Sequence, residues 1–258
     1  MKKPKLKTII LMGVELLLLA VFIFSGLMLW HYYKEGRENA KLYSSLSYER
    51  TKFLESLPLG QKRTAAEQYA PFEAMNEDFA AWLTIEDTPI DYPVMQSEEP
   101  NFYLYRDFQK NSSRYGTLYL AEGCDPDRSM NLLIHGHHMK NGSMFACLTD
   151  YTSEKFYEAH PLIQFDTLKS FGTYEIIAAL KVDLADEKHF PYYDFIDGTE
   201  EEFNAYIQNC KARAFYDTGV EAKFGDQLLT LSTCEYTLNE GRMLVVARRI
   251  EAPKSIHD

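Results

Sequence analysis

The stretch Gln227-Leu228-Leu229-Thr230-Leu231-Ser232-Thr233-Cys234 joins an apolar run to a polar end. Its residue types, its length and its alternation predict a β-strand. Because the side chains of a strand alternate between its two faces, Cys234 shares a face with Ser232 and Thr230. The cysteine therefore ends a mostly polar row. A small hydrophobic residue at a strand end is the alternative interpretation of this cysteine.

A second predicted strand, Met243-Leu244-Val245-Val246-Ala247, begins directly after Arg242. The connection contains the turn signal Asn239-Glu240-Gly241, so the two strands are expected to form an antiparallel hairpin. Cys234 and Arg242 would then face each other. A guanidinium beside a thiol favours the thiolate and can hold an oxyanion. An ion pair of Arg242 with a glutamate of the hairpin is the structural alternative.

The stretch Leu132-Leu133-Ile134-His135-Gly136-His137-His138-Met139 is again an apolar strand that ends in polar residues. It supplies the imidazole that the hairpin lacks. Three close histidines also raise the interpretation of a zinc site, which needs three or four converging donors. Adjacent side chains on an extended chain diverge, and no Cys or His pair stands at ligand spacing elsewhere. We therefore predict no metal site and no other cofactor.

Two of these stretches resemble a known family. Thr230-Leu231-Ser232-Thr233-Cys234 is similar to the TLxTC signature of sortases, and the segment 135–145 is similar to the histidine segment of class B sortases. The order of the elements, their spacing and the later Arg242 match the family from about Phe72 to Ile250. A TLxTC motif alone is weakly specific, whereas three elements in the family's order are much more specific.

The resemblance implies roles for individual residues. In the family the catalytic histidine directly follows a glycine, as His137 follows Gly136, so His137 is expected to be the general acid and base. Cys234 is expected to be the nucleophile. Arg242 is expected to stabilise an oxyanion or to clamp the substrate backbone.

Further positions surround this predicted site. Ser232, on the face of Cys234, could hydrogen-bond a substrate. Leu104 lies in the segment Asn101-Phe102-Tyr103-Leu104-Tyr105-Arg106-Asp107-Phe108, which resembles the region that lines the substrate groove of class B sortases. A packed aromatic and aliphatic run is the alternative for that segment. His135 is expected to orient a partner or to pack, and His138 to point away.

The activity implied is thiol transpeptidation. A threonyl carbonyl in the sorting-signal peptide of a surface protein, such as an NPxTx motif, would form a thioester with the cysteine, and an amine of peptidoglycan or of a pilin would resolve it. Two alternatives remain open. One is a barrel that binds envelope peptides without turning them over, and the other is a cysteine protease in which water resolves the thioester.

The amino-terminal residues predict a membrane anchor. Residues 1–7 contain four lysines, and the 23 residues of segment 8–30 contain one charge, Glu15. Such a helix would be about 34 Å long, enough to cross a bilayer. The lysines predict a cytoplasmic tail at 1–7, a single-pass anchor in the cell membrane at 8–30, and an exported remainder. A cleaved signal peptide is the alternative, but no small-residue cleavage pattern follows the run.

The charged residues bear on the membrane anchor and on the possible partners. A glutamate within a membrane span costs a few kcal/mol, so Glu15 is expected to be protonated or paired with a neighbouring helix. The formal net charge is −11 and no basic stripe is evident. Nucleic acid is therefore not an expected partner.

Two of the four cysteines, Cys147 and Cys210, lie in apolar, helix-like contexts, which favours buried free thiols over disulfides.

The rest of the chain falls into two regions of different composition. Residues 31–80 are rich in Glu, Lys, Ala and Leu, with a break at Pro58-Leu59-Gly60 and a helix-start signature at Thr64-Ala65-Ala66-Glu67. These residues are expected to form an extracytoplasmic helical lead-in, and the alternative is a charged stalk. The resemblance, through the amino-terminal helices of class B sortases, favours the helices.

Residues 81–258 are expected to form the catalytic barrel. About eight short strand-like runs separated by turn residues are typical of a closed sheet, and the resemblance implies the eight-stranded sortase β-barrel. The six runs that precede the hairpin are Trp82–Ile85, Ile90–Val94, Gly116–Ala121, Asn131–His135, Leu162–Asp166 and Thr173–Val182. Two helical insertions are predicted, at Ser143–Ala159 and Thr199–Arg213. A long helix directly before the cysteine strand is a trait of class B. The fold class expected is therefore mainly β with helices.

Overall fold

The computed structural model describes residues 6–55, 64–238 and 240–250. Most of the predicted cytoplasmic tail, the predicted break at Pro58-Leu59-Gly60 and Asn239 of the predicted turn lie outside the described residues. The chain divides into two units, Met1–Leu42 and Tyr43–Asp258.

The first unit consists of most of a long helix, α1 (Leu6–Glu55). Its large apolar side chains from Ile10 to Trp30 are exposed. Within the described part of the chain, α1 is the one helix long and apolar enough to cross a membrane. The helix continues past Trp30 to Glu55 and includes an i,i+4 ion pair of 3.6 Å between Lys34 and Glu38.

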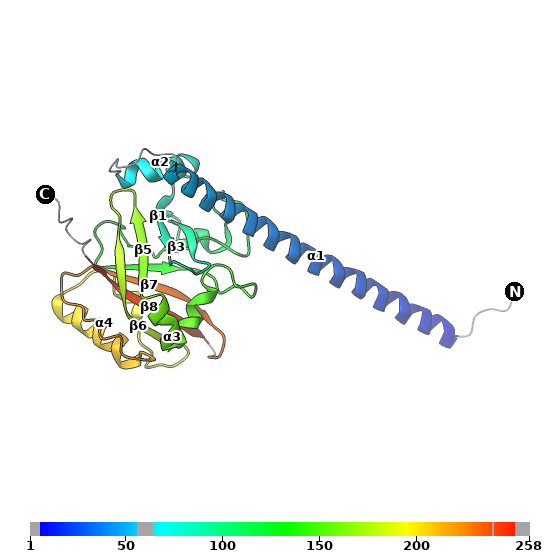
Figure 1. Ribbon diagram of the computed structural model, residues 1–258. Helices are drawn as coiled ribbons and strands as arrows, with labels where there is room; N and C mark the ends of the chain where they lie inside the picture. Colours follow the sequence, from blue (N-terminus) through cyan, green and yellow to red (C-terminus); the bar gives the residue numbers. More distant parts are fainter. Residues whose placement is uncertain (1–5, 56–63, 239, 251–258) are drawn as a thin grey trace. The chain divides into compact units, whose positions relative to one another are not determined.

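The second unit contains a closed β-barrel (Figure 1). The described residues form eight strands: β1 (Phe79–Thr84), β2 (Asp91–Met95), β3 (Leu118–Leu120), β4 (Asn131–His135), β5 (Leu162–Thr167), β6 (Thr173–Asp183), β7 (Leu228–Glu235) and β8 (Gly241–Ile250). Their order around the barrel is β1-β2-β3-β4-β7-β8-β6-β5, and β5 pairs back with β1. The predicted eight-stranded barrel is therefore confirmed.

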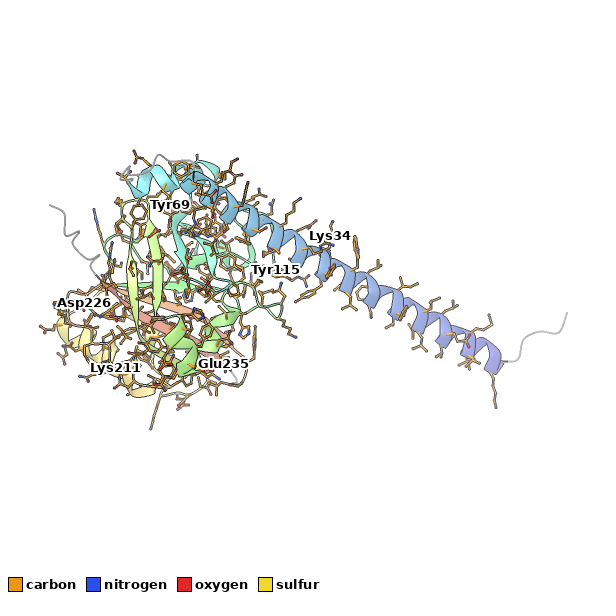
Figure 2. The ribbon with its side chains drawn as sticks, viewed as in Figure 1. Lys34, Tyr69, Tyr115, Lys211, Asp226 and Glu235 are labelled. Atoms are coloured by element: carbon orange, nitrogen blue, oxygen red, sulfur yellow. The ribbon has the colours of Figure 1, made fainter. Side chains whose placement is uncertain are left out.

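A short helix, α2 (Ala65–Met75), packs against β1 and β5. Thr64 and Glu67 form the capping box that the sequence predicts. Figure 2 labels Tyr69 in this region, and the ring of its neighbour Phe72 lies 4.9 Å from that of Trp82. All three rings are buried, so they form a large part of the apolar contact between α2 and the barrel.

Two helical insertions lie between strands. The first is divided into η2 (Ala146–Thr152) and α3 (Glu154–Ala159), because Ser153 is extended. The predicted helical insertion at Ser143–Ala159 therefore consists of two short helices. The second, α4 (Glu200–Arg213), begins with a capping box of Thr199 and Glu202 and buries Phe203, Tyr206, Ile207 and Cys210. It packs on β6 (Figure 1). Two further short turns are η1 (Phe102–Tyr105) and η3 (Tyr192–Asp194).

The pairing of three strands gathers the polar strand ends. β4 and β7 are parallel neighbours, with His135 and Ser232 as Cα partners. β8 is antiparallel to β7, so it begins where β7 ends. The carboxyl ends of β4 and β7 and the amino end of β8 consequently lie at the same end of the barrel.

Candidate active site

The β7–β8 hairpin sets the cysteine opposite the arginine. Cys234 and Arg242 are Cα partners, which confirms the predicted pairing. The carboxylate of Glu235 pairs with Lys181 at 2.9 Å and accepts hydrogen bonds from the backbone and hydroxyl of Thr237. Burial alone would raise its pKa, but these partners hold the pKa of Glu235 below its ordinary value. Glu235 thus shapes the hairpin loop with Lys181 as its ion-pair partner.

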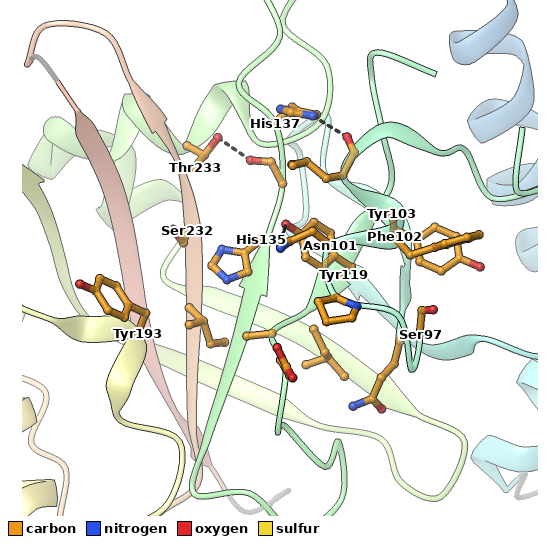
Figure 3. A pocket seen from close by; sticks show the side chains of 18 of the residues that line it. Ser97, Asn101, Phe102, Tyr103, Tyr119, His135, His137, Tyr193, Ser232 and Thr233 are labelled. Atoms are coloured by element: carbon orange, nitrogen blue, oxygen red, sulfur yellow. Dashed lines mark hydrogen bonds between the residues drawn. The ribbon is translucent and has the colours of Figure 1, made fainter. Parts of the chain in front are cut away.

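Three hydrogen bonds continue the link between β4 and β7 beyond the end of β4. The amide of Gly136 donates to Ser232 O at 3.1 Å, and the Thr233 hydroxyl donates to Gly136 O at 2.7 Å (Figure 3). His138 Nδ1 lies 3.1 Å from Cys234 O. A Cβ atom at Gly136 would lie 2.4 Å from the Leu118 side chain. Only glycine therefore fits before His137 in this close approach.

The imidazole of His137 is held by a main-chain carbonyl. Its Nε2 lies 2.7 Å from Leu104 O, a bond drawn in Figure 3. A carbonyl oxygen only accepts, so the Nε2 that bonds to it carries the hydrogen. The ring of Tyr105 lies 5.7 Å from the imidazole. Because Tyr105 is exposed, it forms part of the rim beside His137.

The three neighbouring histidines have different surroundings. His135 lies 5.4 Å from the ring of Tyr119, and burial, followed by the charge of Arg242, lowers the pKa of His135 to about 4. It is therefore neutral at pH 7. His138 lines a different pocket. In the part of the chain that the structure describes, no group of three or more His, Cys, Asp or Glu side chains has the arrangement of a metal site.

All five residues predicted for the site line one groove with a volume of about 870 Å³. They are Cys234, His137, Arg242, Ser232 and Leu104. Figure 3 shows this groove with His135, His137, Ser232 and Thr233 around it. The Cys234 side chain is half-buried, whereas the other three cysteines are buried, and all four are free thiols. The cysteine in the groove is therefore the most exposed of the four.

Two predicted residues have contacts that the sequence does not reveal. The Ser232 side chain is buried, and its hydroxyl lies 2.9 Å from the hydroxyl of Tyr192. Leu104 contributes its carbonyl to His137 as well as a side chain to the lining. Tyr192 and Tyr119 also line the groove and were missed, because they come from a loop and a short strand without a motif of their own.

The comparisons with known proteins agree with this geometry. A family model described as the sortase domain matches residues 83–250, which include the cysteine, the arginine and all three histidines. The chain belongs to the sortase family. Sortases are cysteine transpeptidases. A cysteine, an arginine and a histidine in one groove agree with that activity.

The similar proteins named sortase B span nearly the whole chain. Sortase B of Listeria monocytogenes is 27% identical over 249 residues, which cover 95% of this chain and 99% of the relative. Sortase B of Staphylococcus aureus is 26% identical over 241 residues, 92% of this chain and 96% of the relative. This sortase is accordingly a cysteine transpeptidase of the sortase B type.

Solved structures show the same fold. The Staphylococcus aureus sortase B–substrate complex has a TM-score of 0.76 at 25% identity and covers 84% of this chain and 99% of that one. Sortase B of Clostridium perfringens has a TM-score of 0.66 at 26% identity, over 70% of this chain and 99% of that one. The predicted resemblance to class B sortases is confirmed at the level of family and fold.

Proposed function

We propose that this sortase cleaves the carboxy-terminal sorting signal of secreted proteins and joins them to an amine, with Cys234 as the nucleophile. The observation that carries the proposal is the convergence of Cys234, His137 and Arg242 on one groove at the barrel end. These residues come from three strand ends that the parallel β4–β7 pairing and the β7–β8 hairpin bring together.

The proposed reaction has two halves. The Cys234 thiol passes its proton to His137 and the sulfur attacks a threonyl carbonyl; the peptide C–N bond then breaks and His137 gives that proton to the leaving amine. An incoming amine loses a proton to His137 and attacks the thioester, and the cysteine sulfur leaves and takes the proton back from His137. The Nε2 bond to Leu104 O supports Nδ1 of His137 as the atom that exchanges these protons.

Arg242 is proposed to supply positive charge where the oxyanion forms. Its Cα partner in the hairpin is Cys234, and its guanidinium also donates to Gly241 O at 3.0 Å. A fixed positive charge at this place in the groove would stabilise a tetrahedral oxyanion. Since Lys181 satisfies the carboxylate of Glu235, that neighbouring acid is not the ion-pair partner of Arg242.

The substrates proposed are an NPxTx-like sorting-signal peptide and an amine from peptidoglycan or a pilin. The similar Staphylococcus aureus sortase B has been solved in complex with a substrate, which supports binding of an external substrate by this fold. The groove is large enough for a peptide segment in an extended form, because its volume is about 870 Å³. Ser232 and Leu104 are proposed to contact that peptide.

The cellular placement is proposed from α1 and from the lysines before it. Its exposed apolar residues between Ile10 and Trp30 support a single-pass anchor at 8–30. The lysines of residues 1–7 support a cytoplasmic amino terminus, which would place the helical lead-in at 31–80 and the catalytic barrel at 81–258 outside.

The experiment is a product analysis with and without an amine. The purified full-length protein in detergent micelles is incubated with an NPxTx peptide, alone or with triglycine or a lysine-containing peptide. We expect a ligated product whose mass equals the amino-terminal fragment plus the acceptor. Hydrolysis alone with every amine would make the protein a thiol protease, and binding without cleavage would make it a peptide-binding scaffold.

A further inference from the structure

The position of His137 depends on one carbonyl group. Leu104 O is the hydrogen-bond partner of Nε2 at 2.7 Å, so its position decides where the imidazole lies and which nitrogen is protonated. Leu104 belongs to η1, a short 3-10 turn, and its amide donates to Asn101 O at 3.0 Å. A turn this short needs outside contacts to stay fixed.

The neighbouring segment 116–117 provides those contacts. The amide of Thr117 donates to Tyr103 O at 3.0 Å, and the Thr117 hydroxyl donates to Arg106 O at 2.9 Å. Gly116 lies so close that a Cβ atom there would be 2.6 Å from Leu104 O. Its φ of +59° is also in the left-handed region that favours glycine. The backbone of 116–117 is therefore in direct contact with the carbonyl that holds His137.

The segment 116–117 is in turn fixed by a tyrosine of α1. The Tyr43 hydroxyl donates to Gly116 O at 3.0 Å and lies 2.8 Å from the Thr117 hydroxyl. Its ring packs edge-on against Tyr92 at 5.3 Å. Tyr43 is only 4% exposed, so the hydroxyl has no ready replacement partner in water if its bonds are lost.

We propose that Tyr43 is a positioning residue for catalysis, acting through the segment 116–117 and the Leu104 carbonyl on the imidazole of His137. The inference rests on the proposed function, because it assumes that His137 exchanges protons with the substrate amine. Tyr43 touches neither the substrate nor the reacting atoms. Its effect is to keep Nε2 of His137 protonated and Nδ1 available in the groove.

A small shift of Leu104 O would affect the chemical step more than binding. Proton transfer requires the imidazole within hydrogen-bond distance of the reacting nitrogen, so a displacement of a fraction of an ångström lowers the rate. The groove itself is formed by many residues that Tyr43 does not contact. Loss of the hydroxyl is therefore expected to reduce kcat and to leave KM nearly unchanged.

The experiment compares Tyr43→Phe with Tyr48→Phe in the full-length protein in detergent micelles. Tyr48 lies on the same helix but is 64% exposed, so its substitution controls for the loss of a hydroxyl from α1. We expect Tyr43→Phe to lower kcat for peptide cleavage about ten-fold with little change in KM, and Tyr48→Phe to change neither. Nitrogen-15 NMR of histidine-labelled protein should show His137 as the Nε2–H tautomer in the wild type and a mixture of tautomers in Tyr43→Phe.

A double variant tests whether the residues act in one chain of contacts. Thr117→Val alone should also lower kcat, and Tyr43→Phe combined with Thr117→Val should lose little more than the worse single variant. Wild-type kcat and an unchanged His137 tautomer in Tyr43→Phe would overturn the inference, as would fully multiplicative losses in the double variant. Thermal unfolding of each variant separates these effects from loss of the folded state.

The two proposals fail in different ways. If His137→Ala keeps its activity, the proposed function of His137 is wrong, while the NMR spectrum still reports whether Tyr43 fixes the imidazole. If His137→Ala is inactive but Tyr43→Phe matches the wild type in both kcat and tautomer, only the inference about Tyr43 is wrong.

Discussion

Two pockets of this sortase are each lined by a cysteine and a histidine, and the charged residues near the two cysteines differ. In the groove, half-buried Cys234 is paired across the hairpin with Arg242. In the second pocket, of about 380 Å³, buried Cys147 lies with His138 and Asp150. Burial, followed by the negative charge of Asp150, raises the pKa of Cys147 to about 12. The same residue types thus give an inert thiol in one pocket and a candidate nucleophile in the other.

The two histidines of this comparison are neighbours in the chain. His137 lines the groove and bonds to Leu104 O, whereas His138 lines the second pocket and bonds to Cys234 O through Nδ1. Side chains of adjacent residues in extended backbone point in opposite directions. Both cysteines therefore have an imidazole in their pocket, and the features that separate them are the exposure of the sulfur and the sign of the charged residue nearby.

The largest expected difference is between the two cysteines. Cys234→Ala should abolish cleavage of a fluorogenic sorting peptide, a loss of roughly a thousand-fold or more, because the nucleophile is removed. Cys147→Ala should keep the rate within about two-fold, since its thiol is protonated and buried. Steady-state cleavage assays measure both. Activity of Cys234→Ala above a tenth of the wild-type rate would exclude Cys234 as the nucleophile.

The second difference is between the two histidines. His137→Ala should lower kcat about a hundred-fold or more, the usual contribution of a general acid and base. His138→Ala should cost only a few-fold, through the lost bond to Cys234 O. The same peptide assay gives both values. The opposite ranking would assign the proton transfer to His138 and reverse the comparison of the pockets.

A smaller effect is expected from a change of cation shape. Arg242→Lys keeps the positive charge but loses the planar fork of donors, so kcat should fall about ten-fold. Cys147 provides the internal control. Its reactivity toward a thiol reagent should be the same in the Arg242→Lys variant and in the wild type. An unchanged kcat would show that the planar fork of Arg242 has no part in the reaction.

The last expected effect is on stability rather than on the rate and involves His135. Its pKa is about 4 in the folded protein and about 6.5 when exposed, so between these values the unfolded chain binds the proton and the folded chain does not. The free energy of unfolding should therefore rise with pH across this window, by at most about 1.4 kcal/mol per pH unit from this group. His135→Gln should flatten that rise in urea unfolding. Equal slopes for both proteins would contradict it.

Local patterns predicted one part of the site well. The β7–β8 hairpin and its Cys234–Arg242 pairing follow from a short loop between two strands, and α4 follows from a capping box with apolar residues at helical spacing. Both depend on contacts close in the sequence. The eight-stranded barrel came from the resemblance and from the strand count together.

Local sequence patterns could not predict the contacts between segments that are distant in the sequence. No local signal indicates that β4 lies parallel to β7, or that Leu104 O receives the imidazole of His137. The predicted bounds of two strands were wrong. β1 begins before the predicted Trp82, because its side chains are buried on both faces and the sequence does not alternate between apolar and polar residues there. β3 is shorter than predicted, because Gly116 adopts a positive φ that a strand does not allow.

The most direct test of the account is the identity of the cysteine that carries the acyl group. The full-length protein is incubated with an NPxTx peptide without an amine, denatured, digested and analysed by mass spectrometry. The account predicts that the peptide containing Cys234 gains the mass of the amino-terminal substrate fragment and loses it on treatment with hydroxylamine. An adduct on Cys147, or none on Cys234 while the substrate is cleaved, would contradict it.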